Sequence, residues 1–267
     1  MKRQRLDEIL VQLGLFTDLK TARGWIMSGK IVVNGKVEDK PGALYRPNAD
    51  VFIRGKRSPF ASRGGYKLEH ALRRFDIALD RKVCLDAGAS KGGFTDCMLQ
   101  HGAAKVYAVE VGYGQLSGRL AADPRVISLE RTNIGDLLLG NLCLPISFAA
   151  ADLSYLSLTK AMPIIARLFV ENLNAVCLVK PLYEGLSQDR MADKSALQKV
   201  LASLFSKLDD MGLMPRSTCS SPILGRNGTL EFLAHFDSEP APFSSDELAA
   251  RAIDDLMANP PHPAPID

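Results

Sequence analysis

Acidic and amide side chains recur where successive β-like runs of this sequence end. A glycine-rich turn, Leu85 to Thr95, follows the first such run, and Glu110 follows the second. Asn133 comes shortly after the third run, and Asp152 comes directly after the fourth. In a parallel sheet the carboxyl ends of the strands meet at one edge, and ligands bind there. Polar groups in this order are hard to explain as packing, so they predict a ligand site.

The glycine-rich turn would form one wall of this site. Glycines let a ligand approach the backbone, and the open N-terminus of the following helix would face it. The turn does not match G-x-G-x-x-G, so the dinucleotide fingerprint is absent. Glu110 stands where a carboxylate accepts both hydroxyls of a ribose. This order of groups is expected around S-adenosylmethionine in methyltransferases of this architecture, and the predicted cofactor contacts are Asp86, Gly88, Ser90, Gly92, Gly93, Phe94, Glu110, Asn133 and Asp152.

A sheet must bring these residues together, and the pattern between residues 66 and 236 predicts one. Continuous apolar runs of strand length alternate with amphipathic helical stretches, which is typical of an α/β fold. We expect a parallel, Rossmann-like sheet covered by helices on both faces, with an antiparallel strand in the last pair. The predicted strands are 83–86, 105–109, 126–129, 146–151, 175–180, 214–219 and 230–236, and the helices are 66–75, 94–100, 116–121, 158–169 and 196–211.

A small α+β module precedes this domain. Residues 6–13 and 17–27 show helical spacing, and Asn34-Gly35 predicts a tight hairpin, with a further strand at 51–54. Residues 1–57 hold 12 Lys and Arg against 6 Asp and Glu, a net charge of +6. The remainder holds 21 against 24, a net charge of −3. Such a basic module favours a polyanionic partner, most simply nucleic acid, over an ordinary solvated surface.

Charged and helix-breaking residues mark the domain boundaries. Residues 55–62 predict a linker, which divides the chain into domains 1–57 and 58–237. Residues 238–267 form an acidic segment with six prolines and only one basic residue against six acidic ones. We expect a mobile tail there, apart from a helix over 245–257 capped by Ser244 or Ser245.

The composition excludes several other classes of protein. The chain is 46% hydrophobic and 24% charged with a mean hydropathy of +0.00, as in ordinary globular proteins. It has no run of about 18 apolar residues and no apolar leader at its start, so we expect a cytoplasmic protein without a membrane span. The five cysteines stand singly and the four histidines lack metal-ligand spacing, so we expect reduced cysteines and no metal site.

The front module resembles the S4 domain, a small RNA-binding domain named after a ribosomal protein. The resemblance rests on Arg5 to Leu10, Gly14, Ala22-Arg23 and Gly29 to Val37, and it covers about the first 55 residues. In that family, basic residues of the helical hairpin and the next strand lie against RNA phosphates. The resemblance therefore implies RNA contacts by Lys2, Arg3, Arg5, Lys20, Arg23 and Lys30, to which we add Arg63 at the start of the second domain.

The second domain carries strings that resemble the hemolysin A (TlyA) family. They are Ser62 to Leu68, Gly92 to Cys97, Val106 to Val109, Gly112 to Leu116, Asp152 to Ser154, Leu178 to Pro181 and Gly228 to Phe232. With the front module, the resemblance runs from about residue 2 to residue 237. Members of the family are ribosomal RNA 2′-O-methyltransferases with an FtsJ-like second domain. The resemblance implies an S-adenosylmethionine-dependent enzyme that methylates a ribose of ribosomal RNA within ribosomal subunits.

The family also has a Lys-Asp-Lys-Glu tetrad, which corresponds here to Lys67, Asp152, Lys180 and Glu231. A ribose hydroxyl is a poor nucleophile until a base takes its proton. Lys180 can be that base if burial and the second ammonium, that of Lys67, favour its neutral form. Asp152 and Glu231 would orient the two lysines.

Other functions fit the residues less well. Methylation of an exocyclic amine would require an Asn/Asp-Pro-Pro-aromatic turn at Asp152, and methylation of a base carbon would require a cysteine after the fourth strand. Tyr155 or Tyr183 would stack on a flipped base or serve only in packing. Two alternatives of another class stay open: a non-catalytic RNA-binding factor for ribosome assembly and a membrane-lytic hemolysin. No long apolar-basic amphipathic helix supports the latter.

Overall fold

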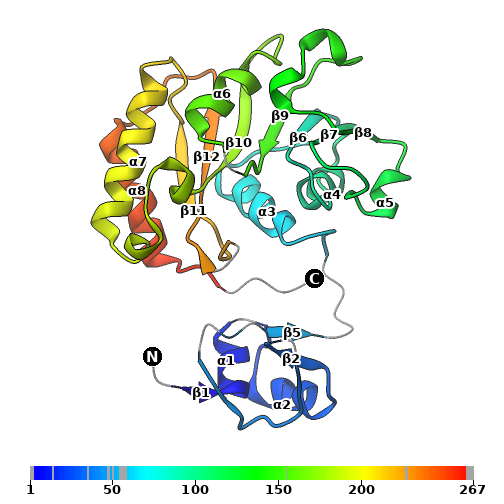
Figure 1. Cartoon of the computed structure of the whole chain (residues 1–267), viewed down its shortest axis with the longest axis vertical. Helices are drawn as coiled ribbons and strands as arrows, with labels where there is room; N and C mark the ends of the chain where they lie inside the picture. Colours follow the sequence, from blue (N-terminus) through cyan, green and yellow to red (C-terminus); the bar gives the residue numbers. More distant parts are fainter. Residues whose placement is uncertain are drawn as a thin grey trace. The chain divides into compact units, whose positions relative to one another are not determined.

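The structure is a computed structural model of the chain. It describes residues 3–13, 15–34, 36–46, 49, 51–53, 59–154, 156–225 and 228–262. Two compact units are distinguished (Figure 1): the first comprises residues 1–59, 223–228 and 262–267, and the second comprises residues 60–222 and 229–261.

The first unit is a small α+β fold. Its helices are α1 (Leu6–Gln12) and α2 (Leu19–Met27), and Asp18 caps α2 by accepting a hydrogen bond from the Thr21 amide. An antiparallel sheet has the order β3 (Lys36–Glu38), β2 (Ile31–Val33), β5 (Val51–Ile53), and the short strands β1 (Gln4–Arg5) and β4 (Leu44–Tyr45) pair separately. The buried apolar side chains of the helices and strands form its core, including Leu6, Leu10, Ala22, Ile26, Ile31 and Val51.

The predicted helices and strands of this unit are confirmed, with ends that differ by one or two residues. The β1–β4 pair escaped prediction because two-residue strands carry no periodicity. Four parts of these predictions lie outside the described residues: Gly14 as a helix end, Gly35 of the hairpin, Arg54, and the first half of the predicted linker, residues 55–58.

The second unit contains a seven-stranded sheet of the order β11-β12-β10-β9-β6-β7-β8. Strands β6 to β10 are parallel, and β12 is antiparallel to both β10 and β11. This confirms the predicted parallel sheet with an antiparallel strand in the last pair. The strands are β6 (Val83–Ala87), β7 (Lys105–Glu110), β8 (Val126–Glu130), β9 (Phe148–Ala151), β10 (Asn174–Val179), β11 (Ser217–Ser220) and β12 (Phe232–Asp237).

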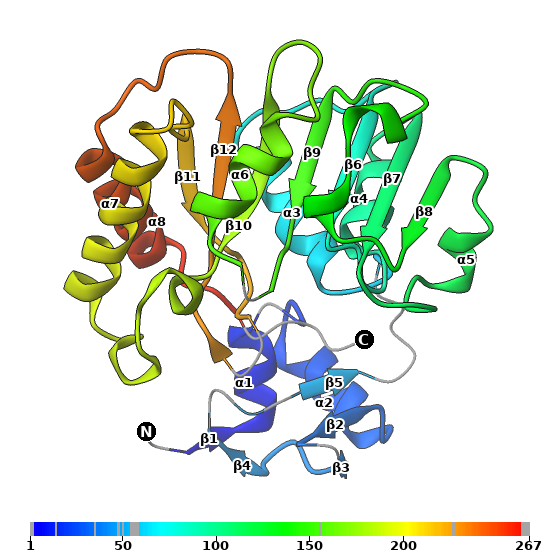
Figure 2. The same ribbon diagram turned by 45° about the horizontal axis from the view of Figure 1, so that its top comes forward.

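Helices cover both faces of this sheet, which Figure 2 shows with its strands side by side. One hydrophobic core lies under α6, α7 and α8, and the other lies under α3, α4 and α5. Both faces of the central strands are therefore buried, which explains their continuous apolar runs. The helices are α3 (Gly64–Arg74), α4 (Gly93–Gln100), α5 (Gly118–Ala121), α6 (Leu158–Ala166), α7 (Lys194–Asp209) and α8 (Ser245–Ala258).

The helix predicted over 245–257 is confirmed as α8. Ser244 and Glu247 form its capping box. Leu248, Ala252 and Ile253 are buried in the core that α8 shares with α7. The prolines of residues 238–267 lie outside α8, and the apolar stripe of this helix packs against the hydrophobic core. Residues 263–267 lie outside the described part of the chain.

Candidate active site and RNA-binding surface

The sheet brings the four tetrad residues to one edge. Asp152 directly follows β9 and Lys180 directly follows β10, and these two strands are parallel neighbours. Glu231 directly precedes β12, which runs antiparallel to β10 with Val179 opposite Phe232. The start of β12 therefore lies beside the end of β10. Lys67 reaches the same place from α3.

Ion pairs join the tetrad into a chain. The Lys180 Nζ atom lies 2.6 Å from Asp152 Oδ1, and the Lys67 Nζ atom lies 3.8 Å from Asp152 Oδ2. Lys67 Nζ also lies 2.7 Å from Glu231 Oε2. Lys180 Nζ donates a further hydrogen bond to the Leu153 carbonyl at 3.0 Å. The predicted tetrad is thus assembled before any substrate arrives.

Burial differs across this chain of charges. The side chains of Lys67 and Glu231 are 9% and 5% exposed, whereas those of Lys180 and Asp152 are 15% and 26% exposed. Burial raises the pKa of Glu231, and the Asp152 carboxylate adds to this effect, while Lys67 opposes it. The Lys180–Asp152 pair is therefore the more exposed part of the predicted tetrad, and Lys67 and Glu231 form its buried part.

The glycine-rich turn lies against the same edge. Gly88 has φ +87°, and a Cβ atom there would lie 2.7 Å from the Asp152 carbonyl oxygen. The turn is also tied to the neighbouring strand, because the Gly88 and Ala89 amides both donate to the Val109 carbonyl at 3.0 Å. A side chain at Gly88 would push the turn away from Asp152, so this glycine keeps the turn close to the tetrad.

Asp86 lies beneath the turn and is fully buried. Its Oδ2 atom accepts hydrogen bonds from the Thr95 amide at 2.8 Å and the Thr95 hydroxyl at 2.6 Å, which holds the first turn of α4. Burial raises the pKa of Asp86 to about 7. Its Oδ1 atom is buried and, within the described part of the chain, has no hydrogen-bond partner. Buried polar atoms usually have a hydrogen-bond partner, so this oxygen is a candidate contact for a ligand or a water molecule.

Glu110 lies at the end of β7 and faces the exposed part of the turn. Its Oε2 atom accepts a hydrogen bond from the Ser90 amide at 2.9 Å, and its Oε1 atom accepts one from the Gly112 amide at 2.8 Å. The Ser90 hydroxyl bonds Gln115 at 3.3 Å. The carboxylate is thereby fixed in place and only partly buried, and each oxygen keeps a lone pair for a ligand hydroxyl.

Three other predicted cofactor residues, Phe94, Gly92 and Gly93, have structural roles inside the domain. Phe94 is 3% exposed and belongs to the core beneath α3 and α4. Gly92, with φ +91°, leaves room for Leu120, and a Cβ atom on Gly93 would lie 2.2 Å from the Ser62 hydroxyl. Packing therefore explains why these three positions hold a phenylalanine and two glycines. Direct cofactor contacts by these residues stay a prediction.

Asn133 is exposed, and its side chain caps the short helix η1 (Ile134–Asp136) by accepting from the Gly135 amide. Its contact with a cofactor also stays a prediction. Asn133 comes three residues after β8, next to the β7 edge that carries Glu110.

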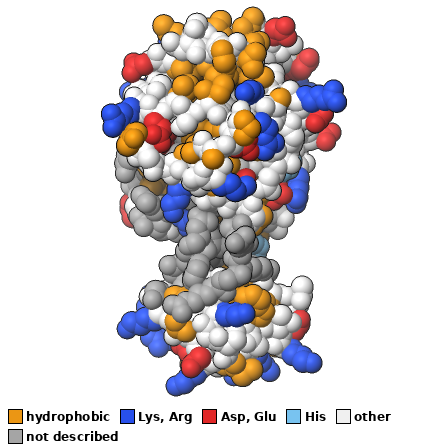
Figure 3. Space-filling model, turned by 90° about the vertical axis from the view of Figure 1, so that its right-hand side faces the viewer, with side chains coloured by type: hydrophobic (Ala, Val, Ile, Leu, Met, Phe, Trp, Pro, Cys, Tyr) orange, Lys and Arg blue, Asp and Glu red, His pale blue; other side chains and the backbone are white. Residues whose placement is uncertain are grey.

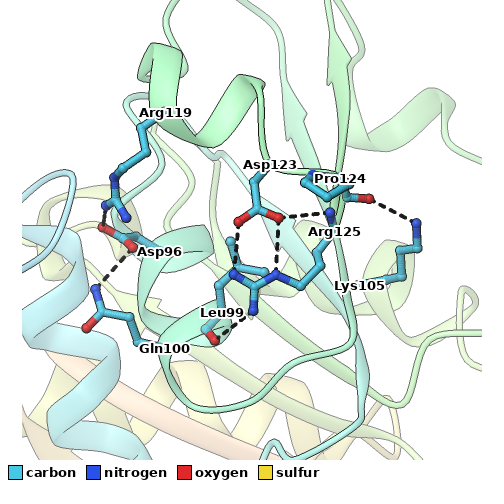
Figure 4. A network of polar contacts seen from close by, with 8 residues as sticks. All are labelled: Asp96, Leu99, Gln100, Lys105, Arg119, Asp123, Pro124 and Arg125. Carbon is cyan, nitrogen blue, oxygen red and sulfur yellow. Dashed lines mark hydrogen bonds and ion pairs between the residues drawn. The ribbon is translucent and has the colours of Figure 1, made fainter.

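A buried carboxylate that the sequence analysis missed, Asp96, joins three parts of this region. Its side chain is 1% exposed and accepts hydrogen bonds from Arg119 of α5 and from Gln100 (Figure 4). It also accepts one from the Ala61 amide ahead of α3. It therefore ties the helix after the glycine-rich turn to the segment that leads into the Lys67 helix. A single aspartate in the first turn of a helix is ordinary, so only the folded structure shows this role.

A second missed carboxylate, Asp7, organises the basic residues of the first unit. Its side chain is 0% exposed. Both oxygens bond Arg5, at 3.0 and 2.9 Å, and Oδ2 also accepts from Arg23 Nε at 2.6 Å. The side chains of Arg5 and Arg23 remain 44% and 47% exposed. Two predicted RNA contacts are thus held side by side with donors still free for a phosphate.

The other predicted RNA contacts of this unit are exposed, and basic side chains stand out on its visible face (Figure 3). Arg3 and Lys20 form no ion pair with any residue that the structure describes, and the Lys30 Nζ atom lies 4.9 Å from the centre of the Trp25 ring. Lys2 lies outside the described residues, and Arg63 is half-buried in the second unit just before α3. A cavity of about 430 Å³ lies between Arg3, Tyr45 and Arg46, and Arg46 was not predicted.

The Asp7 cluster predicts a pH dependence for the first unit. Arg5 and Arg23 lower the pKa of Asp7 to about 2 from an ordinary value of 3.8. Because the folded pKa is depressed, the stabilisation is complete above about pH 4 and is lost as the pH falls through about 2. We expect a loss of about 1 to 2 kcal/mol, reduced by the exposure of both arginines.

Trp25 is the only tryptophan of the chain, so its fluorescence reports unfolding of this unit alone. Denaturant titrations would compare wild type with Asp7→Asn. Unfolding would be followed by fluorescence excited at roughly 295 nm, which selects tryptophan. The variant should be less stable at pH 6, and its stability should change less between pH 4 and pH 2. If the stability of both proteins changed equally between pH 4 and pH 2, this result would contradict the ion-pair account.

The described residues contain neither a membrane-spanning helix nor a cluster of metal ligands. Among the residues that the structure describes, no helix has the length and apolar character needed to cross a membrane. The same residues include no group of three or more His, Cys, Asp or Glu side chains placed to hold a metal ion. All five cysteines are free thiols, and four of them are buried.

Comparisons with known proteins agree with this geometry. An FtsJ-like methyltransferase model matches residues 60–236, and an S4 domain model matches residues 4–51. Hemolysin A of Brachyspira hyodysenteriae is 39% identical over 241 residues, which cover 87% of this chain and 99% of the relative. The Mycobacterium tuberculosis 16S/23S rRNA (cytidine-2′-O)-methyltransferase TlyA is 33% identical over 262 residues, which cover 96% of each chain. A solved Streptococcus thermophilus structure described as a hemolysin is 35% identical, with a TM-score of 0.70, over 97% of this chain and 98% of that one.

The sheet order, its one antiparallel strand and the site at the carboxyl ends of the parallel strands define a Rossmann-like methyltransferase. More particularly, the chain belongs to the hemolysin A (TlyA) family, in which an S4 domain precedes an FtsJ-like methyltransferase domain. The family resemblance and the fold class predicted from the sequence are both confirmed.

Proposed function

We propose that this protein is an S-adenosylmethionine-dependent methyltransferase that modifies a ribose 2′-hydroxyl of ribosomal RNA, in the cytoplasm and within ribosomal subunits. The observation that carries the proposal is the Lys180–Asp152 pair, partly exposed at the sheet edge and backed by Lys67 and Glu231. The name of the Mycobacterium tuberculosis relative, a 2′-O-methyltransferase of rRNA, supports the same substrate class.

The residues around the glycine-rich turn fit S-adenosylmethionine. Glu110 presents a fixed carboxylate suited to the two ribose hydroxyls, and the exposed Ser90 and Lys91 leave the outer side of the turn accessible. The buried Asp86 Oδ1 atom lacks a partner among the described residues, which suits a site completed by a ligand. When bound, the cofactor supplies an electrophilic methyl group on a sulfonium.

The tetrad then acts on the acceptor nucleotide. The Lys180 Nζ atom, when unprotonated, would accept the proton of the ribose hydroxyl, so that the hydroxyl oxygen becomes nucleophilic towards the methyl group that the cofactor would supply. Asp152 and the Leu153 carbonyl hold the Lys180 amine in one direction. Lys67 also pairs with Asp152 and, in turn, with Glu231, so it helps to fix the Asp152 carboxylate beside Lys180.

We expect Glu110→Ala to weaken S-adenosylmethionine binding by roughly 1.5 to 3 kcal/mol, the range for hydrogen bonds to a charged group. Titration calorimetry would measure the affinity, with Glu171→Ala, an exposed loop carboxylate, as the matched control. Because Glu110 also bonds two backbone amides, the melting temperature of the variant must be recorded beside its affinity. Unchanged affinity in a folded Glu110→Ala protein would remove Glu110 from the cofactor site.

The proposed reaction itself can be tested with purified protein, methyl-labelled S-adenosylmethionine and isolated ribosomal subunits. We expect label in ribosomal RNA and none without the protein. Binding to subunits without any transfer of label would favour the alternative of a non-catalytic RNA-binding factor.

A further inference from the structure

Glu184 joins the two loops that carry Asp152 and Lys180. It ends the short helix η3 (Pro181–Glu184), which begins directly after Lys180. Its Oε2 atom accepts a hydrogen bond from the Ser157 hydroxyl at 2.6 Å, and its Oε1 atom accepts one from the Leu158 amide at 2.9 Å. Ser157 and Leu158 begin α6, at the far end of the loop that starts with Asp152.

The Ser157 side chain is the centre of this contact. Ser157 is the N-cap of α6, and its hydroxyl oxygen accepts from the Thr159 amide at 3.3 Å. The same oxygen lies 2.9 Å from the Thr159 hydroxyl. The Glu184 carboxylate therefore binds a helix N-terminus that is already capped, where a negative charge is favourable.

Two ties consequently cross between the loops. Lys180 forms the first through its bonds to Asp152 and the Leu153 carbonyl. Glu184, four residues after Lys180, forms the second tie through its bonds to Ser157 and Leu158 at the end of the Asp152 loop. The helix η3 between them is tightly folded, because the Tyr183 amide donates to the Lys180 carbonyl at 2.8 Å, and the Tyr183 ring lies 5.6 Å from Lys180 Nζ.

Glu184 does not touch any member of the tetrad in the described contacts, and helix capping alone would explain its bonds to α6. Its placement does more than cap a helix, however. A carboxylate within α6 or in the loop before it could cap the helix equally well. Glu184 instead belongs to the loop that carries the proposed base. Loss of this tie would free the Lys180 loop from the Asp152 loop on one side.

We propose that Glu184 is a positioning residue for methyl transfer: it holds the Lys180 loop against the Asp152 loop, so that the Lys180 amine points at the acceptor hydroxyl. This inference rests on the proposed function. Cofactor binding should not depend on Glu184, because the glycine-rich turn and Glu110 belong to β6 and β7, on the other side of β9. A misdirected base costs rate, since proton transfer needs hydrogen-bond geometry.

The test compares Glu184→Ala with Glu247→Ala. Glu247 makes the same kind of contact in α8, where it accepts from the Ser244 amide and hydroxyl at 2.8 Å, and it is not part of the site. Both variants lose a carboxylate at a helix N-cap, so they should lose similar stability. We expect kcat for methyl transfer to ribosomal subunits to fall about 10- to 100-fold in Glu184→Ala only.

The affinity for S-adenosylmethionine should stay within about twofold of wild type in both variants. Glu184→Gln keeps an acceptor oxygen for the Leu158 amide, so it should recover part of the lost kcat. An equal fall in kcat in Glu184→Ala and Glu247→Ala, or no fall in a folded Glu184→Ala protein, would overturn the positioning role.

A second measurement does not require activity. Amide hydrogen exchange of a peptide that covers the end of β9 and the start of α6 should be faster in Glu184→Ala than in wild type and unchanged in Glu247→Ala. Exchange as slow as in wild type would overturn the inference even if no methyl transfer were found. Failure of the proposed function, in contrast, would show as an inactive wild type with the exchange difference intact.

Discussion

Lys180→Ala is expected to lower methyl transfer to ribosomal subunits by a factor of about a thousand or more. General bases contribute rate factors of this size when substrate positioning also depends on them. The variant removes the only tetrad amine that lies on the more exposed side of Asp152. Lys67 is 9% exposed and bound to Glu231, so it cannot replace Lys180 without breaking that pair. The loss should appear in kcat.

The cofactor affinity of Lys180→Ala should remain within about threefold of wild type, because the base acts on the acceptor hydroxyl. Lys160→Ala, an exposed lysine of α6, is the matched control and should keep full activity. Near-normal turnover by Lys180→Ala with normal cofactor affinity would place the base elsewhere and refute the assignment of the tetrad.

Removing basic side chains from the first unit should reduce the affinity for ribosomal RNA. It should also reduce the dependence of this affinity on salt. Arg3, Lys20 and Lys30 have no carboxylate partner among the described residues, so their replacement by Gln leaves no buried charge unpaired. If each contacts one phosphate, the slope of log affinity against log salt should become shallower by about 2 to 3. Arg5 and Arg23 are kept because Asp7 beneath them is buried.

A control variant removes the same number of positive charges from the second unit. Lys194, Lys199 and Lys207 are exposed on α7, and their replacement by Gln should leave the slope unchanged. Filter-binding or anisotropy measurements over a salt series would compare the three proteins, and cofactor affinity should be equal in all of them. Equal slopes for the two triple variants would show that overall charge, and not the first unit, retains the RNA.

Most of the fold could be predicted because its signals are local. Continuous apolar runs marked the buried strands, and the parallel arrangement then placed Asp152 and Lys180 at one edge. The serine cap and the helical pattern also predicted α8 within the acidic, proline-rich C-terminal segment. They did not predict its packing, in which Leu248 and Ile253 complete a core whose other side chains come from distant parts of the chain.

The tetrad could be named by resemblance, but its internal order required the structure. The register of β10 and β12 sets Glu231 beside the strand that ends at Lys180, and only the fold shows that Glu231 bonds Lys67. Asp7, Asp96 and Glu184 were missed altogether. Each is an ordinary surface-type residue in sequence, and its role depends on a partner that a different element supplies.

The identity of the methylated atom tests the central claim most directly. Ribosomal subunits would be incubated with the protein and methyl-labelled S-adenosylmethionine, and the RNA would be digested to nucleosides and separated by mass spectrometry. The Lys180–Asp152 site predicts label in one or more 2′-O-methylribose nucleosides, and none of it after Lys180→Ala. Label on a base, or equal ribose label with the Lys180→Ala protein, would contradict the account.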